Sequence, residues 1–245
     1  MNLWMTCLIQ HYKRMKDRWP DDRLLVVFDI DGTILDTRHV VLDLLKSYDE
    51  VHGTNVFKNL GLVDITTHED QVECILSGTG VSINEATDIV QWYESQQWDI
   101  NTMLESHKPF SGVMELIQWF QHQNNTYVGL NTGRSENLRD ETLFSLNRTW
   151  EEATPIFTDD LLFMNSFDWG QVEQSKVSGI QQFQESNYKI VAMIDNEPSN
   201  LAAISHWDSG GEIMLLHADT IFRGARDLLP TGTVSGNVYD LTGIS

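Results

Sequence analysis

Four short, mostly apolar runs constrain the fold of this chain more than any other feature. They cover residues 24–28, 126–130, 189–194 and 212–216. Runs of this length are typical of strands that are buried on both faces of a parallel sheet. Between them, residues 113–120 and 172–183 place apolar side chains at helical spacing. Because strand and helix patterns alternate, the sequence predicts an α/β fold with a doubly wound parallel sheet.

Residues 38–108 interrupt this alternation, because they contain helical patterns but no convincing buried strand. One helical face is formed by Val41, Leu44, Leu45 and Tyr48. A second helix is predicted to start near Ser82, since Ser82 and Glu85 have the spacing of a capping box. We therefore expect a mostly helical domain at residues 38–108, inserted into a core formed by residues 1–37 and 109–245.

The composition is that of a globular protein. The chain has 245 residues, of which 41% are hydrophobic and 21% charged, and this length can bury a substantial core. Its two cysteines, Cys7 and Cys74, lack the spacing of a zinc site and do not form a disulfide framework. Free thiols of this kind are compatible with a reducing compartment.

No segment of the sequence is predicted to cross a membrane. A helical span needs about 18 consecutive apolar residues, and no run approaches that length. Residues 1–19 are too rich in charged and aromatic side chains for a secretory leader, and they predict a short amphipathic helix. We therefore expect a cytoplasmic protein without a membrane partner.

The charge of the chain argues against nucleic acid as a partner. Thirty-six acidic residues against 16 basic ones give a formal net charge of −20, which repels a phosphate backbone. The same field opposes any anionic substrate at long range. An enzyme acting on phosphates would therefore need local cations or a metal ion at its site.

Polar residues follow three of the predicted strands at the points where they end. These segments are Asp29-Ile30-Asp31-Gly32-Thr33, Asn131-Thr132-Gly133-Arg134 and Asp195-Asn196. In an open α/β sheet, ligands bind beyond the carboxyl ends of the strands. The three segments are therefore expected to converge on one site.

The Asp-x-Asp pattern indicates a cation at that site. Residues i and i+2 of an extended chain point the same way, so Asp29 and Asp31 can share a site. Carboxylates so close repel each other unless a cation lies among them. Together with Asp195 they form the oxygen-rich set that suits Mg²⁺. Gly32 permits a tight turn next to the ligand.

These segments carry a resemblance to a known family. The sequence Phe28-Asp29-Ile30-Asp31-Gly32-Thr33-Ile34-Leu35-Asp36-Thr37 resembles the first motif of the haloacid dehalogenase superfamily, and residues 130–134 resemble the second. Lys176 resembles the third motif and residues 194–200 the fourth, in the family's order. The resemblance implies a Rossmann-like core and a C1-type cap at residues 38–108.

The resemblance also implies roles for individual residues. Asp29 would attack phosphorus and form an aspartyl-phosphate, and Asp31 would act as general acid and base. Thr132 would bind the transferring phosphoryl oxygens, and Lys176 would neutralise charge there. Asp29, Asp195 and the backbone carbonyl of Asp31 would hold Mg²⁺.

One part of the fourth motif departs from the family pattern. A second acidic residue usually follows the first, whereas Asn196 and Asn200 stand at the corresponding positions here. An amide oxygen can still bind Mg²⁺ or orient a water, so we expect metal binding to persist, and Asn200 can also hydrogen-bond near Lys176.

Other residues are candidates for contacts around the site. Arg134 can reach phosphate or substrate, or form a loop salt bridge, and Asn131 and Gly133 flank Thr132. Lys189 is the rival of Lys176 as the cation, but it begins a strand and would lie at the opposite end of the sheet.

The sequence favours a Mg²⁺-dependent phosphohydrolase that acts on a small phosphorylated metabolite. Dehalogenases of the family lack the second aspartate, so Asp31 favours phosphate over halide as the group attacked. Two alternatives remain open: a phosphomutase of the β-phosphoglucomutase type, and a non-catalytic binding module that retains the fold. The sequence predicts neither the individual substrate nor the oligomeric state.

Overall fold

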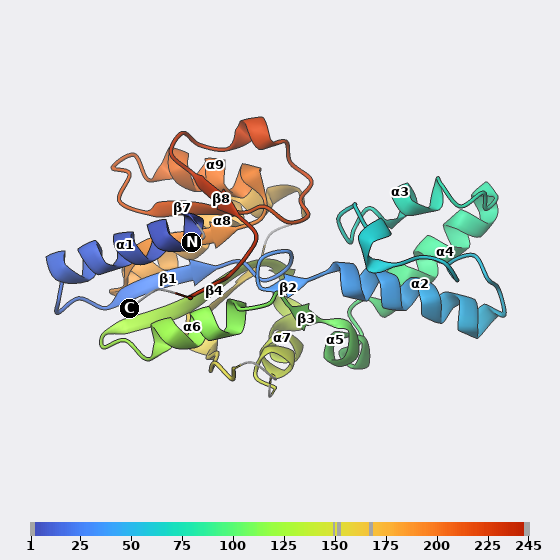
Figure 1. Cartoon of the computed structure of the whole chain (residues 1–245), viewed down its shortest axis with the longest axis horizontal. Helices are drawn as coiled ribbons and strands as arrows, with labels where there is room; N and C mark the ends of the chain where they lie inside the picture. The colour runs from blue at the N-terminus through green and yellow to red at the C-terminus, as the bar shows by residue number, and fades with distance from the viewer. Residues whose placement is uncertain (1–2, 149, 151–152, 167–168, 243–245) are drawn as a thin grey trace. The chain divides into compact units, whose positions relative to one another are not determined.

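The computed structural model describes residues 3–148, 150, 153–166 and 169–242. Its contacts divide the chain into two compact units. One consists of Met1–Ile34 and Pro109–Ser245, and the other of Leu35–Lys108. Each unit is described separately below (Figure 1).

The larger unit is built on a six-stranded sheet in the order β5-β4-β1-β6-β7-β8. Its strands are β1 (Leu24–Phe28), β4 (Thr126–Ser135), β5 (Leu162–Asn165), β6 (Lys189–Asp195), β7 (Met214–Ala218) and β8 (Val234–Gly236). Neighbouring strands all pair in parallel. The predicted α/β, Rossmann-like doubly wound fold is confirmed.

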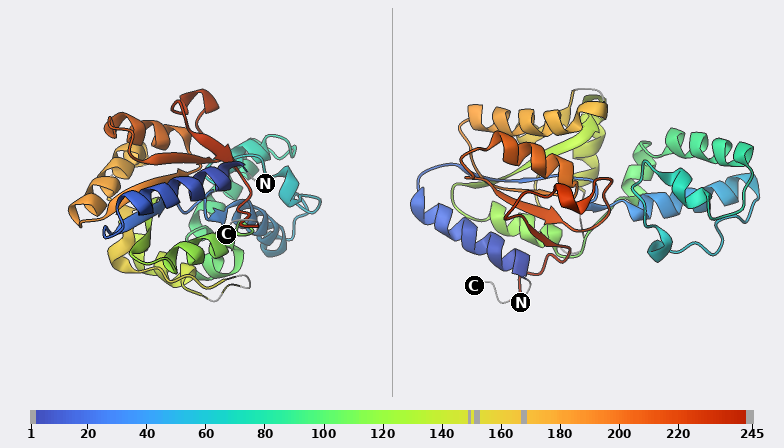
Figure 2. Two further views of the ribbon diagram at one scale, coloured as in Figure 1. Left: turned by 60° about the vertical axis from the view of Figure 1, so that its left-hand side comes forward. Right: turned by 90° about the horizontal axis from the view of Figure 1, so that it is seen from above.

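Helices cover both faces of this sheet (Figure 2). They are α1 (Leu3–Arg18), α6 (Val113–Gln121), α7 (Arg139–Leu146), α8 (Val172–Glu185) and α9 (Pro198–Trp207). α8 and α9 lie on one face, where Leu25 and Val27 of β1 join their apolar side chains in one buried cluster. α1 and α6 lie on the other face, where the rings of Tyr12 and Phe120 are 5.2 Å apart. All five residues of β1 are buried, as its uninterrupted apolar run predicts.

The smaller unit is mostly helical. It contains α2 (Arg38–His52), α3 (Val72–Leu76), α4 (Ile83–Gln96) and α5 (Ile100–Ser106), with a 3₁₀ turn at Leu62–Asp64. Its core is formed by residues of these helices, among them Val41, Leu45, Tyr48, Ile89 and Tyr93. The expected capping box is present, because Ser82 N donates to Glu85 at 2.9 Å and Glu85 N donates to Ser82 Oγ at 3.3 Å. The short strands β2 (Leu35–Asp36) and β3 (Lys108–Pro109) pair where the chain passes between the units.

Several elements differ from the sequence prediction. The last predicted strand, at residues 212–216, is shifted to Met214–Ala218, and β4 continues to Ser135 instead of ending at residue 130. The edge strands β5 and β8 were not predicted, because runs of four and three residues are too short to show a period. The N-terminal helix spans Leu3–Arg18, while the first two residues of the predicted segment lie outside the described residues. Among the helices described, none has the length and apolarity needed to span a membrane.

Candidate active site

Strand register brings three of the predicted site segments to the same level of the sheet. β1 lies between β4 and β6, and Phe28 is in register with Leu130 on one side and Ile194 on the other. The next residues of the three chains are Asp29, Asn131 and Asp195. The backbone N of Asp29 donates to Ile194 O at 2.9 Å, which extends the pairing into the site. Asp29 and Asp195 therefore converge from adjacent parallel strands.

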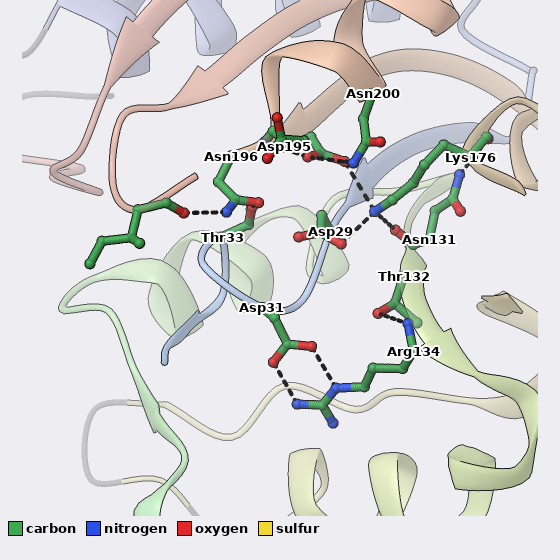
Figure 3. Close-up of polar contacts among 12 residues, drawn as sticks. Asp29, Asp31, Thr33, Asn131, Thr132, Arg134, Lys176, Asp195, Asn196 and Asn200 are labelled. Carbon is green, nitrogen blue, oxygen red and sulfur yellow. Dashed lines mark hydrogen bonds and ion pairs between the residues drawn. The ribbon is translucent and has the colours of Figure 1, made fainter. Parts of the chain in front are cut away.

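Lys176 of α8 lies between these two aspartates (Figure 3). Its Nζ forms an ion pair with Asp29 Oδ1 and a second one, at 3.0 Å, with Asp195 Oδ2. It also donates to the backbone oxygen of Asn131 at 2.5 Å. The Lys176 side chain is only 1% exposed, so the whole cluster is shielded from water. Lys189, the rival cation, begins β6 in register with Leu24 at the opposite edge of the sheet.

The charges in this cluster do not balance. Burial raises the pKa of Asp29 to about 7, and the negative charges of Asp195 and Asp31 also raise it, while Lys176 lowers it. Burial opposes the charged form of Lys176, but the Asp195 and Asp29 carboxylates outweigh it and raise the pKa of this ammonium group. Lys176 is therefore positive at neutral pH, and it is shared by two buried carboxylates. With one positive charge facing two carboxylates, the cluster would be stabilised by a further cation.

Asp31 is held by Arg134 and not by Lys176. Arg134 Nε and Nη2 donate to the two carboxylate oxygens of Asp31, both at 2.7 Å, in a bidentate pair (Figure 3). The Arg134 side chain is 1% exposed, and its Nη1 donates to Thr142 Oγ1 of α7 at 3.2 Å. Of the two roles expected for Arg134, the structure shows a salt bridge, which is partly buried and joins it to the second aspartate of the first motif.

The other residues of the second motif hold this edge of the sheet together. Asn131 Nδ2 donates to the backbone oxygen of Lys176 at 2.8 Å, so Asn131 and Lys176 bind each other reciprocally. Thr132 is buried at the same edge, and its Oγ1 accepts a hydrogen bond of 3.2 Å from Arg134 N. Gly133 faces α8, where a Cβ would lie 3.3 Å from Val172. The motif thus positions both cationic side chains of the site.

Gly179 lets α8 approach Asn131 closely enough for this reciprocal contact. A Cβ at position 179 would lie 2.7 Å from the carboxamide of Asn131. The contact is tighter than real Cβ atoms tolerate, and the Asn131 carboxamide is confined by its bond to Lys176. The Asn131 carboxamide therefore packs directly on the backbone of Gly179, and we call this close contact the Gly179–Asn131 interlock.

Replacing Gly179 with alanine is expected to destabilise the fold by about 1–3 kcal/mol, the usual cost of overpacking. The added methyl group must displace Asn131 or shift α8. Urea unfolding of Gly179→Ala measures the cost, and the double variant Asn131→Ala/Gly179→Ala should recover part of it, because the smaller side chain leaves space. Additive losses in the double variant would contradict the interlock.

Asn196 lies under the turn that follows β1 and does not point to Lys176. Its Nδ2 donates to Ile221 O at 2.6 Å, and its Oδ1 accepts from Thr33 Oγ1 at 3.4 Å. Gly32 has a φ of 76°, and a Cβ there would lie 2.2 Å from Asn196 Nδ2. Glycine is thus required at position 32 for both backbone conformation and space.

Asn200 of α9 holds Asp195 in place. Its Nδ2 donates to both carboxylate oxygens of Asp195 at 3.2 Å, and Glu197 N donates to Asp195 Oδ1 at 2.8 Å. The expected proximity of Asn200 to Lys176 therefore arises through Asp195, which both side chains contact. Within the described residues, Asn200 Oδ1 is buried without a hydrogen-bond partner.

The donor set at this edge suits a hard divalent cation. Carboxylate oxygens from Asp29 and Asp195 converge here around Lys176. Burial first, and then the nearby negative charges of Asp195 and Asp31, raise the pKa of Asp29. Among the described residues, no group of three carboxylate, imidazole or thiolate side chains could hold a metal ion. The carboxylate of Asp31 pairs with Arg134. Mg²⁺ binds through few carboxylates and keeps waters as its other ligands, so two carboxylates and a backbone carbonyl are compatible with it.

Thr220 and Tyr239, which bind the turn after β1, were not predicted from the sequence. The Thr220 hydroxyl donates to Gly32 O, and the Tyr239 hydroxyl donates to Thr33 O at 2.7 Å. Both bonds fix the turn after β1 from the C-terminal part of the chain. No motif or periodicity marks either residue, so only the folded chain could identify them.

Comparison with known proteins agrees with the fold and the first two motifs. The family model described as haloacid dehalogenase-like hydrolase matches residues 26–150, which is about half of the chain. No curated protein sequence matches the chain. Three similar solved structures are reported below, and at 10–12% identity they bear on the fold alone.

A haloacid dehalogenase-superfamily hydrolase of subfamily IA from Geobacter sulfurreducens has a TM-score of 0.51 at 12% identity, covering 82% of this chain and 91% of its own. A predicted phosphoglycolate phosphatase from Haemophilus somnus has a TM-score of 0.53 at 10% identity, covering 90% and 96%. A predicted phosphatase from Clostridium acetobutylicum has a TM-score of 0.50 at 12% identity, covering 88% and 94%. By its match to the family model over residues 26–150, the chain belongs to the haloacid dehalogenase-like hydrolases.

Proposed function

We propose that this chain is a Mg²⁺-dependent phosphohydrolase that removes the phosphoryl group of a small phosphate ester through an aspartyl-phosphate on Asp29. The observation that carries the proposal is the buried Asp29–Lys176–Asp195 cluster, with Asp31 two residues after Asp29. A carboxylate nucleophile, an acid–base carboxylate and a fixed cation are the groups that phosphoryl transfer of this kind requires.

The proposed reaction has two displacements at phosphorus. In the first, a carboxylate oxygen of Asp29 forms a bond to phosphorus while the ester P–O bond breaks, and Asp31 gives a proton to the leaving alcohol. In the second, Asp31 takes a proton from water, which attacks phosphorus and releases inorganic phosphate from Asp29. The nucleophile is regenerated, and the net reaction is hydrolysis of the ester.

The other residues stabilise charge on the phosphoryl group. Lys176 already contacts Asp29, so its ammonium group lies where the attacking and transferring oxygens would be. Thr132 is buried at the same edge and can donate a hydrogen bond from its hydroxyl to a phosphoryl oxygen. Asp29, Asp195 and the backbone carbonyl of Asp31 would hold Mg²⁺, which supplies further positive charge when bound.

Arg134 positions the acid–base residue in this scheme. Its bidentate pair orients the ionised Asp31 carboxylate, which is the form that takes a proton from water, and one of the two bonds opens when Asp31 carries the proton for the leaving alcohol. Arg134 is itself immobilised by burial and by Thr142. A lysine could neutralise Asp31 but could not offer two parallel donors.

The substrate class follows from the site and from the charge of the chain. With a net charge of −20, the protein lacks the field that would attract a polyanion, so local cations must bind the phosphate. A small phosphorylated metabolite satisfies this condition. We assign the selection of the metabolite to the helical unit Leu35–Lys108, in the role of a cap.

Hydrolysis of p-nitrophenyl phosphate by the purified chain tests the function. We expect release of nitrophenol that requires Mg²⁺, is lost with EDTA and returns when Mg²⁺ is restored. A screen of phosphate esters under the same conditions then identifies the metabolite. Binding of Mg²⁺ without turnover of any ester would instead support a non-catalytic module, and isomerisation of a sugar phosphate dependent on a bisphosphate primer would support a phosphomutase.

A further inference from the structure

The turn after β1 is fastened by a residue from the far end of the chain. We call residues 29–34 the β1 loop, which contains Asp29, Asp31 and Gly32. The hydroxyl of Tyr239, 206 residues away, donates to the backbone oxygen of Thr33 at 2.7 Å. Tyr239 is 2% exposed and Thr33 is fully buried. This bond is therefore buried, and it holds the loop that begins with the proposed nucleophile.

The N-terminal helix α1 holds Tyr239 in place. Trp4 Nε1 donates to Val238 O at 2.9 Å, and the rings of Trp4 and Tyr239 are 5.1 Å apart. Residues 237–242, which we call the C-terminal segment, follow β8. Figure 2 shows this segment beside the start of α1. Gly236 leaves room for the Trp4 ring, since a Cβ there would lie 2.4 Å from it. The packing of Trp4 therefore fixes the position from which Tyr239 contacts the β1 loop.

A second glycine, Gly112, lies against the backbone of Tyr239. Gly112, just before α6, has a φ of 82°, and a Cβ there would lie 2.0 Å from the backbone oxygen of Tyr239. The backbone of Tyr239 is therefore closely packed against Gly112. Tyr239 is thus held from two elements, with its backbone packed on Gly112 and its ring beside Trp4 of α1.

The hydroxyl of Tyr239 keeps its proton and can therefore donate a hydrogen bond. Burial raises the pKa of Tyr239, and the negative charge of Asp29 raises it further, so the phenol keeps its proton. Thr33 O accepts a hydrogen bond from this hydroxyl, while the neighbouring carbonyl of Gly32 accepts one from Thr220. Successive carbonyls of the β1 loop are thus fixed by two hydroxyl groups.

We infer that Tyr239 is a positioning residue for phosphoryl transfer, which holds the β1 loop so that Asp29 and Asp31 keep their places without touching the substrate itself. The inference rests on the proposed function. It assigns a task to α1 and to the C-terminal segment, both outside the 26–150 region that the family model matches. The physical reason is that displacing a reacting group by a fraction of an ångström lowers the rate of a positioned reaction.

The test compares Tyr239→Phe with a matched control, Tyr12→Phe. Tyr12 is also buried, and its hydroxyl hydrogen-bonds to Thr126 Oγ1 at 2.8 Å, at the start of β4 and thus at the opposite edge of the sheet. Each variant loses one buried hydroxyl and keeps its ring. Urea midpoints should shift by similar amounts in the two variants.

We expect kcat for p-nitrophenyl phosphate to fall about tenfold or more in Tyr239→Phe, with KM within about twofold, because the loop is misplaced and the binding groups remain. Tyr12→Phe should keep kcat within about twofold of wild type. Equal kcat in the two variants, or a change in KM alone, overturns the inference.

Amide hydrogen exchange separates this inference from the proposed function. Peptides covering residues 29–34 should exchange faster in Tyr239→Phe than in Tyr12→Phe or wild type. If wild type hydrolyses no ester, the proposed function fails. Faster exchange of residues 29–34 in Tyr239→Phe would still show that Tyr239 holds the β1 loop. If exchange in this loop is equal in all three proteins, Tyr239 does not hold it and the inference fails.

Discussion

Asp29→Asn should reduce hydrolysis of p-nitrophenyl phosphate by about 10⁴-fold or more, because a carboxamide is a poor nucleophile and forms no acyl-phosphate of the aspartyl type. Asp29 accepts from Lys176 in a buried site, and the asparagine keeps its shape and one acceptor oxygen. The variant should therefore fold. Steady-state kinetics with saturating Mg²⁺ measures the loss, and retention of activity in a folded Asp29→Asn protein would falsify the nucleophile assignment.

Asp208→Asn is the matched control for this substitution. Asp208 Oδ2 accepts from Ile213 N at 2.8 Å, just before β7 begins and therefore away from the carboxyl edge of the sheet. It undergoes the same chemical change as Asp29→Asn. Its kcat should stay within about twofold of wild type. A similar loss of kcat in both variants would indicate a general structural effect.

The raised pKa of Asp29 predicts how the stability of the metal-free protein varies with pH. In the unfolded chain the carboxyl group loses its proton near its ordinary pKa of 3.8, whereas burial in the folded protein raises this pKa to about 7. The folded state therefore binds more protons between these values, and stability falls as pH rises through them. Urea unfolding in EDTA at pH 5 and pH 8 measures this decline. In Asp29→Asn the decline should be smaller, and an unchanged decline contradicts the assignment to Asp29.

Lys176→Met should lower kcat by about 10³-fold and the free energy of unfolding by about 3–5 kcal/mol, since it leaves two buried carboxylates without their cation. The Lys176 ammonium contacts Asp29 and lies 3.0 Å from Asp195. Methionine is of similar length, so loss of charge dominates over loss of volume. Kinetics and urea unfolding give the two effects separately, and added Mg²⁺ should recover stability more than activity.

Lys189→Met is the control for Lys176→Met and also tests the rival cation. Lys189 begins β6 at the opposite edge of the sheet, and its Nζ lies 3.7 Å from Glu212, where both side chains are partly exposed. Exposed pairs of this kind contribute about 0–1 kcal/mol. The variant should have nearly wild-type kcat. A large loss in Lys189→Met combined with full activity in Lys176→Met would reverse the assignment.

Local patterns in the sequence predicted the central strands and the edge of the sheet that carries the site. β1 is apolar throughout because both its faces are covered, and Asp29 follows it directly, so the strand and its polar end were visible together. Parallel register then requires that residues after neighbouring strands meet, which places Asp195 beside Asp29. Lys176 was different, since a helical lysine has no periodic signature, and only the resemblance to the family indicated it.

The amino-acid sequence by itself determined the α/β class, the order of the site segments and the residues that carry charge to one edge. The tertiary structure alone decided the partner of each charge: Arg134 binds Asp31, Lys176 lies between Asp29 and Asp195, and Tyr239 fastens Thr33. The physical reason is the separation along the sequence of the residues that interact. Strand and helix patterns repeat over a few residues, whereas the bond from Tyr239 spans 206 positions and depends on how α1, the sheet and the C-terminal segment pack together.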